Sequence, residues 1–193
     1  LKEHTGRTKK GQGINQKGDP FSDDQQILDF LKTLPIDSPF KKDADAATRW
    51  NNAFCLMAEL GLRPTEVNKL IIKKDPTTKE FYWFCTYEKK GGGGTTEPRR
   101  IEPLPLLDRD GKEVQWNLID RFRANLLPLP DRVDGDACKV YLQRREGWKQ
   151  LKEMMKKKEG SNLVPYSFRH YYSLEVTLQA LILEVWLQVW GTL

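Results

Sequence analysis

The chain of 193 residues is long enough for one ordinary domain with a hydrophobic core of its own. Its 32 Lys and Arg residues exceed its 27 Asp and Glu residues, and the formal charge of +5 favours an anionic partner such as nucleic acid. The three cysteines are far apart and form no CxxC pair, so the sequence predicts neither a zinc site nor a disulfide framework and indicates a reducing compartment.

The N-terminal half of the sequence is typical of an arm followed by helices. Residues 1–20 are basic and rich in Gly and polar side chains, which predicts a flexible arm or linker. Residues 21–35 and 43–62 carry apolar side chains at helical spacing, and Gly61 is a natural end for the second helix. Residues 64–74 predict a third helix that begins with a proline in its first turn.

The middle of the chain changes its periodicity. Residues 80–88 are aromatic and β-branched, which predicts a strand, and residues 99–106 predict a second extended segment with prolines that suit a sheet edge. Residues 89–98 between them are basic and glycine-rich, so we expect a β-hairpin with a flexible tip. Residues 113–126 and 137–158 return to helical periodicity, and the second of these predicted helices is strongly basic.

These segments predict one mainly α domain of the α+β class over residues 21–174, with a small antiparallel β-sheet inserted after the third helix. Residues 175–193 are different, because they form an apolar tail that contains no Lys or Arg. No signal peptide and no apolar run of bilayer-spanning length is recognisable, so no membrane is predicted as a partner. The first residue is Leu rather than Met, which is typical of a fragment.

The stretch "LGLRPTEV" is the first candidate for chemistry. Arg63 lies between two predicted helices, near a helix N-terminus where anions are also favoured. Glu66 follows three residues later and can hold Arg63 in place through a bidentate pair. The ordinary alternative is a surface arginine that caps a turn.

The tip of the predicted hairpin is the second candidate. Lys89 and Lys90 precede four glycines, which allow the backbone to approach a phosphate chain closely. The ordinary alternative is a solvated loop with two unremarkable lysines.

The stretch "VPYSFRHYYS" is the third candidate. Arg169 and His170 lie among aromatic residues, three of which have the spacing of a buried helical face. A buried arginine needs a partner or an anionic ligand, because an unpaired buried charge is costly. The ordinary alternative is a core helix in which Arg169 pairs with an internal acid.

The three stretches together are more specific than any one of them. Two arginines far apart in sequence and a lysine on a hairpin tip are typical of a phosphodiester site. Guanidinium groups bind phosphate oxygens in a forked geometry and stabilise the charge of a pentavalent transition state, and a lysine can protonate the leaving alkoxide.

Residues 22–174 resemble the catalytic domain of the tyrosine recombinase (phage integrase) family. "ELGLRPTEVNKL" is similar to the first arginine motif of that family, "TYEKKGGGGTTEPRRIEPLPL" to its lysine hairpin, and "VPYSFRHYYS" to its second arginine box. The resemblance implies a tyrosine recombinase-like fold and a set of site residues. These are the catalytic residues Arg63, Lys90 (with Lys89 as the rival) and Arg169, the supporting residues Glu66, Tyr166 and His170, and the DNA-binding residues Lys89, Arg99 and Arg100.

The resemblance also implies a reaction. In this family a tyrosine attacks the scissile phosphate of double-stranded DNA to form a 3′-phosphotyrosyl bond, and a released 5′-hydroxyl of a partner strand reverses the step. No metal or cofactor is implied, and the partners are DNA and other recombinase protomers in a prokaryotic cytoplasm. Tyr166 stands where the family usually has His, which departs from the pattern for proton transfer.

The parts of the family pattern that should follow Arg169 are missing from the sequence. There is no His or Trp in a GH-like motif, and Tyr171 and Tyr172 follow Arg169 too closely to be the nucleophile. Two explanations of the tail are open. It is either a frameshifted reading of the family's C-terminal segment, in which the codons of Trp190 and Gly191 would encode a glycine, or a genuine divergent apolar helix. We therefore expect a recombinase catalytic domain that is inactive in DNA cleavage.

Two other functions are compatible with the sequence. The first is a non-catalytic DNA-binding module that uses the basic arm and residues 138–158, with structural roles for Arg63 and Arg169. The second is an intact recombinase whose nucleophilic tyrosine comes from another chain.

Overall fold

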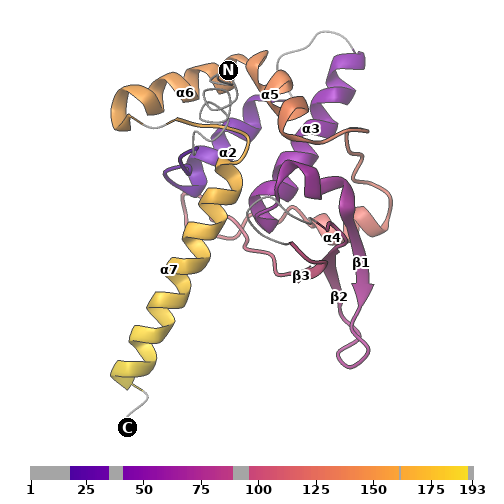
Figure 1. Cartoon of the computed structure of the whole chain (residues 1–193), viewed down its shortest axis with the longest axis vertical. Helices are drawn as coiled ribbons and strands as arrows, with labels where there is room; N and C mark the ends of the chain where they lie inside the picture. Colours follow the sequence, from indigo (N-terminus) through magenta and orange to yellow (C-terminus); the bar gives the residue numbers. More distant parts are fainter. Residues whose placement is uncertain (1–17, 35–40, 89–95, 161, 191–193) are drawn as a thin grey trace, which may run out of the picture.

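The computed structural model describes residues 18–34, 41–88, 96–160 and 162–190 (Figure 1). Within these ranges the chain forms six α-helices, one 3-10 helix (η1) and one three-stranded sheet. The elements in chain order are α2 (Asp24–Thr33), α3 (Lys41–Leu60), η1 (Pro64–Lys69), β1 (Leu70–Lys74), β2 (Phe81–Cys85), β3 (Arg99–Ile101), α4 (Leu118–Arg123), α5 (Gly135–Gln143), α6 (Glu146–Glu159) and α7 (Ser167–Trp190). The prediction of a mainly helical α+β protein with a small antiparallel sheet is confirmed at this level.

The sheet is antiparallel, with the strand order β1-β2-β3. Trp83 and Cys85 of β2 and Ile101 of β3 are buried, so these strands bury alternate side chains on one face as an amphipathic strand should. Trp83 meets Phe122 of α4 edge to face, with ring centroids 5.3 Å apart. The sheet is thereby attached to the helical part of the molecule.

An aromatic cluster joins segments that lie far apart in the sequence. The ring of Phe168 at the start of α7 lies 4.8 Å from Phe21 and 5.4 Å from Phe54, and Phe30 lies 5.2 Å from Trp148, all measured between centroids. Aromatic pairs at such distances add about 1 kcal/mol each beyond the burial of their area. The first turns of α7 are therefore fixed against α2 and α3.

The sequence-based prediction of elements was wrong at three places. Residues 70–74, expected to continue a helix, form β1, because Ile71 and Ile72 pair with β2 in a ladder. The helix expected over residues 113–126 covers only Leu118–Arg123, since Asn117 adopts a left-handed conformation with φ 51°. The single basic helix expected over residues 137–158 is divided into α5 and α6 at an extended Arg145.

The second half of α7 projects away from the other helices (Figure 1). Its large apolar side chains are exposed from Leu174 to Trp186, whereas Phe168 and Tyr171 in its first turns are buried. None of the helices in the described ranges combines the length and the apolarity that crossing a lipid bilayer requires.

Candidate functional site

The carboxylate of Glu66 lies at the centre of a group of arginines. Glu66 is fully buried in η1, and its Oε2 accepts a hydrogen bond from the backbone N–H of Arg63 at 2.9 Å. Its Oε1 accepts from Nη1 of Arg63 at 3.0 Å and from Nη2 of Arg99 at 3.1 Å. Nη1 of Arg169 lies 3.8 Å from Oε2. We call these four residues the arginine cluster.

The local sequence explains how Arg63 and Glu66 meet. Helix α3 ends at Leu60, and Gly61 turns the chain with a φ of +58°, which glycine adopts at little cost. Arg63 then has an extended backbone, and Pro64 begins η1 with its fixed φ. Glu66 is the third residue of η1, so its side chain folds back onto the N–H of Arg63, as in a capping box.

Arg169 reaches the cluster from the opposite end of the sequence. The aromatic cluster fixes the first turns of α7, and Nη1 of Arg169 donates to the carbonyl oxygen of Gly61 at 2.7 Å. Burial lowers the pKa of Arg169, and the charge of Arg63, which contacts the same carboxylate, lowers it further. Tertiary packing holds these like charges together.

The arginine cluster carries more positive than negative charge. Three guanidinium groups face one carboxylate, so two positive charges are uncompensated within the cluster. The side chains of Arg63, Arg99 and Arg169 keep 30 %, 33 % and 30 % of their surface exposed, so all three can also contact a ligand from solvent. Such an arrangement favours an anion with several oxygens, such as phosphate, because each guanidinium offers five donors in a planar fork.

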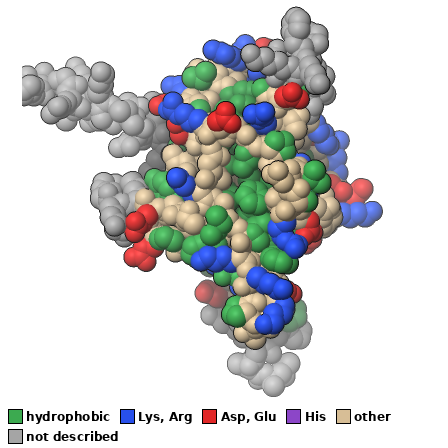
Figure 2. All heavy atoms as spheres, turned by 90° about the vertical axis from the view of Figure 1, so that its right-hand side faces the viewer, with side chains coloured by type: hydrophobic (Ala, Val, Ile, Leu, Met, Phe, Trp, Pro, Cys, Tyr) green, Lys and Arg blue, Asp and Glu red, His purple; other side chains and the backbone are tan. Residues whose placement is uncertain are grey.

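Positive charge elsewhere is arranged differently. Figure 2 shows Lys and Arg side chains interspersed with acidic and hydrophobic ones on the face it presents, rather than gathered in one patch. Arg109, for example, pairs with Asp29 at 3.2 Å, and both side chains are at least half exposed. Exposed pairs of this kind contribute little to stability and create no anion site.

The other predicted site residues have different positions. Tyr166 is partly exposed, and partial burial raises the pKa of its phenol while the charge of Arg63 lowers it. His170 is the neighbour of Arg169 in α7, and its backbone N–H donates to the carbonyl oxygen of Tyr166 at 3.1 Å. Arg100 is not part of the cluster, since its guanidinium pairs with Asp75 and Glu102. Lys89 and Lys90 lie outside the described residues.

Two contributors to the site were missed by reasoning from the sequence. Thr96 accepts a hydrogen bond from Nη1 of Arg63 at 3.1 Å, and no pattern around this threonine distinguishes it. Gly61 was recognised as a helix end, but its carbonyl also binds Arg169, and a Cβ at this position would lie 2.2 Å from the ring of Tyr172. The one signal that the sequence offered for the role of Gly61 was its position two residues before Arg63.

The two tyrosines after Arg169 are engaged in hydrogen bonds. The hydroxyl of Tyr171 donates to Asp24 at 2.8 Å, and that of Tyr172 donates to the carbonyl oxygen of Glu102 at 2.8 Å. Burial raises the pKa of both phenols, and the carboxylate of Asp24 adds to the effect on Tyr171. Neither hydroxyl is therefore activated as a nucleophile in this arrangement.

Comparisons with known proteins identify no relative. The chain matches no family model, no curated protein sequence and no solved structure at a significant level. Across the described ranges, no group of three or more His, Cys, Asp or Glu side chains is placed to hold a metal ion. The arginine cluster is thus the most distinctive chemical feature of the described structure.

Proposed function

We propose that this chain binds the phosphodiester backbone of double-stranded DNA at the arginine cluster and that it is the catalytic domain of a tyrosine recombinase. One observation carries the proposal, namely that Arg63 and Arg169, far apart in sequence, meet at the buried carboxylate of Glu66. These are the residues that the recombinase resemblance assigns to one phosphate. A recombinase-like arrangement of the helices around the small sheet is part of the same proposal.

The chemistry follows from the charges. Arg63 and Arg169 bind the non-bridging oxygens of the phosphate, and Glu66 holds Arg63 in position through its backbone N–H and its guanidinium. In a strand exchange the two arginines would stabilise the additional negative charge of the pentavalent transition state. A hairpin lysine, Lys90 or its rival Lys89, would give a proton to the leaving 5′-oxygen.

We do not expect this chain to form a covalent bond to DNA by itself. After Arg169 the sequence offers only Tyr171 and Tyr172 as tyrosine nucleophiles, and both phenols are held in hydrogen bonds with raised pKa values. Strand cleavage would then depend on a tyrosine from outside residues 1–193. A suicide DNA substrate checks this, because a covalent adduct formed by this chain alone would contradict the expectation.

A second candidate function is a non-catalytic DNA-binding module. Helix α6 favours it, since its last turn carries Lys156, Lys157 and Lys158 at an exposed end. In that case the phosphates lie along α6, and the arginine cluster has a structural role only. The triple substitution of these lysines by alanine would then weaken DNA binding more than any change in the arginine cluster.

The experiment that tests the proposal is fluorescence anisotropy with a labelled DNA duplex at two salt concentrations. We expect R63A and R169A each to weaken binding about tenfold, as loss of a charge-assisted hydrogen bond does, and wild-type affinity to fall steeply with salt because counterions are released. R109A is the control, since it removes the same charge from an exposed pair with Asp29. The proposal fails if R63A and R169A bind DNA as R109A does.

A further inference from the structure

Arg99 and Arg100 are neighbours on β3 with opposite orientations. Side chains alternate across a strand, and Arg99 shares the face of the buried Ile101, whereas Arg100 lies on the other face. Arg100 has acidic and aromatic partners there, because it contacts Asp75 at 3.5 Å, pairs with Glu102 and lies over the ring of Tyr82 at 4.5 Å, while 47 % of its side chain stays exposed. Arg99 instead points to Glu66.

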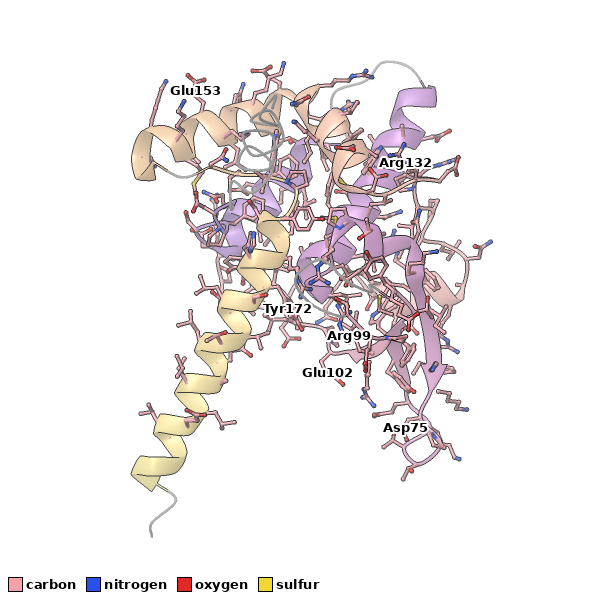
Figure 3. All side chains as sticks on the ribbon, in the orientation of Figure 1. Asp75, Arg99, Glu102, Arg132, Glu153 and Tyr172 are labelled. Carbon is pink, nitrogen blue, oxygen red and sulfur yellow. The ribbon has the colours of Figure 1, made fainter. Side chains whose placement is uncertain are left out.

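The position of Arg99 is next to Arg63. Nη2 of Arg99 and Nη1 of Arg63 donate to the same oxygen, Oε1 of Glu66, so the two guanidinium groups lie within two hydrogen-bond lengths of each other. Figure 3 shows Arg99 between α7, which carries Tyr172, and the strands, while Asp75 lies at the far end of the sheet. One phosphate group is large enough to contact both guanidinium groups from the exposed side.

Arg99 also has unused hydrogen-bonding capacity. Its Nη1 is buried and finds no hydrogen-bond partner among the described residues, although a third of the side chain as a whole is exposed. A buried guanidinium N–H without an acceptor costs about 1–3 kcal/mol. An anion bound beside Glu66 would supply the acceptor and offset this cost.

We propose that Arg99 is a third arginine ligand of the phosphate that Arg63 and Arg169 bind. This inference rests on the proposed function and deepens it. Arg99 supplies the second of the two uncompensated positive charges of the arginine cluster, and a charge of two matches the pentavalent transition state of a phosphodiester better than its singly charged ground state. The site is thus suited to a phosphate under attack, with the strand β3 providing one of its three cations.

The test compares Arg99 with the other two arginines of the cluster and with an arginine outside it. We measure the anisotropy of a labelled duplex with wild type, R99A, R63A, R169A and the control R109A over a range of salt concentrations. R99A should weaken binding about tenfold, as we expect for R63A and R169A. The decrease of log K with log salt should also become less steep by about 1 in each of these variants, because each loses one phosphate contact. R109A should stay within about twofold of wild type with a nearly unchanged slope, since Arg109 lies in an exposed pair with Asp29 outside the arginine cluster.

The outcomes separate the two proposals. If R63A and R169A lose affinity and R99A behaves as R109A does, the role of Arg99 is refuted and the proposed function stands. If all four variants bind as wild type does, the proposed function fails and the role of Arg99 fails with it.

If R99A does not fold, the variant R99K decides. It keeps the positive charge but not the fork, so a loss of threefold or more supports the inference and wild-type affinity overturns it.

Discussion

Nη1 of Arg169 donates a hydrogen bond of 2.7 Å to the carbonyl oxygen of Gly61, the residue that follows α3 and begins the turn to Arg63. This contact joins the two halves of the arginine cluster through the backbone as well as through Glu66. The ring of Tyr172, one turn further along α7, covers the same glycine. Any change at Gly61 therefore acts on both Arg169 and the packing of α7 against α3.

Replacing Gly61 by alanine should be strongly destabilising. The residue has a φ of +58°, which costs about 1 kcal/mol for alanine, and its Cβ would lie 2.2 Å from the ring of Tyr172, which adds about 1–3 kcal/mol of overpacking. G160A is the matched control, because Gly160 has a φ of +66° and no atom within 4 Å of the added Cβ. Urea denaturation measures both. Equal losses in the two variants would show that the contact with Tyr172 does not matter.

Replacing Glu66 by glutamine should leave three guanidinium groups without their counter-charge. We expect E66Q to lower the free energy of unfolding by about 3 kcal/mol, as the removal of one partner from a buried ion pair does. Added sulfate should restore more stability to E66Q than to wild type, because the anion can replace the missing carboxylate. E102Q, which removes an exposed carboxylate beside Arg100, serves as the control. Equal responses of E66Q and E102Q to sulfate would contradict this account.

Glu59 in α3 should make the stability of the protein depend on pH. Burial raises the pKa of its carboxyl to about 7 from an ordinary value of 4.5. The folded state therefore holds the proton more tightly than the unfolded state between these two values, so stability falls as pH rises through this window and stays lower above it. E59Q should remove the dependence and be more stable than wild type by about 2 kcal/mol at pH 8, but not at pH 4.5.

Urea denaturation at the two pH values checks the role of Glu59. E153Q is the control, since Glu153 is an exposed partner of Lys157. If E59Q and wild type show the same change between the two pH values, the carboxyl of Glu59 does not retain its proton in the folded protein.

The exposed apolar side chains of α7 should drive self-association. Leu181, Ile182, Leu183 and Val185 are each more than half exposed, and contiguous apolar surface of this kind promotes association. I182K should lower the apparent mass in light scattering while leaving the free energy of unfolding within about 0.5 kcal/mol of wild type. V140K adds the same charge at an exposed valine of α5 and should not change association. Association that persists in I182K would refute a role for this surface.

Local sequence alone determined the features that depend on neighbouring residues. The helical spacing in residues 43–62, the end of that helix at Gly61 and the pairing of Arg63 with Glu66 three residues later all follow from short-range geometry. The edge position expected for residues 99–106 is confirmed for β3, although only Arg99–Ile101 form the strand. The coarse fold class was likewise predictable, because periodicity changes visibly in the middle of the chain.

Only the tertiary structure decided which distant residues meet. Residues 70–74 are a strand because β2 offers them hydrogen bonds, and a helical pattern in one segment cannot reveal a partner elsewhere. The two arginines of β3 are alike in sequence, yet the register of β3 on β2 sends Arg99 to Glu66 and Arg100 to Asp75. Arg169 joins them because α7 packs on α3 through Phe168 and Phe54. The site is assembled by strand register and helix packing, which are long-range and leave no local mark in the sequence.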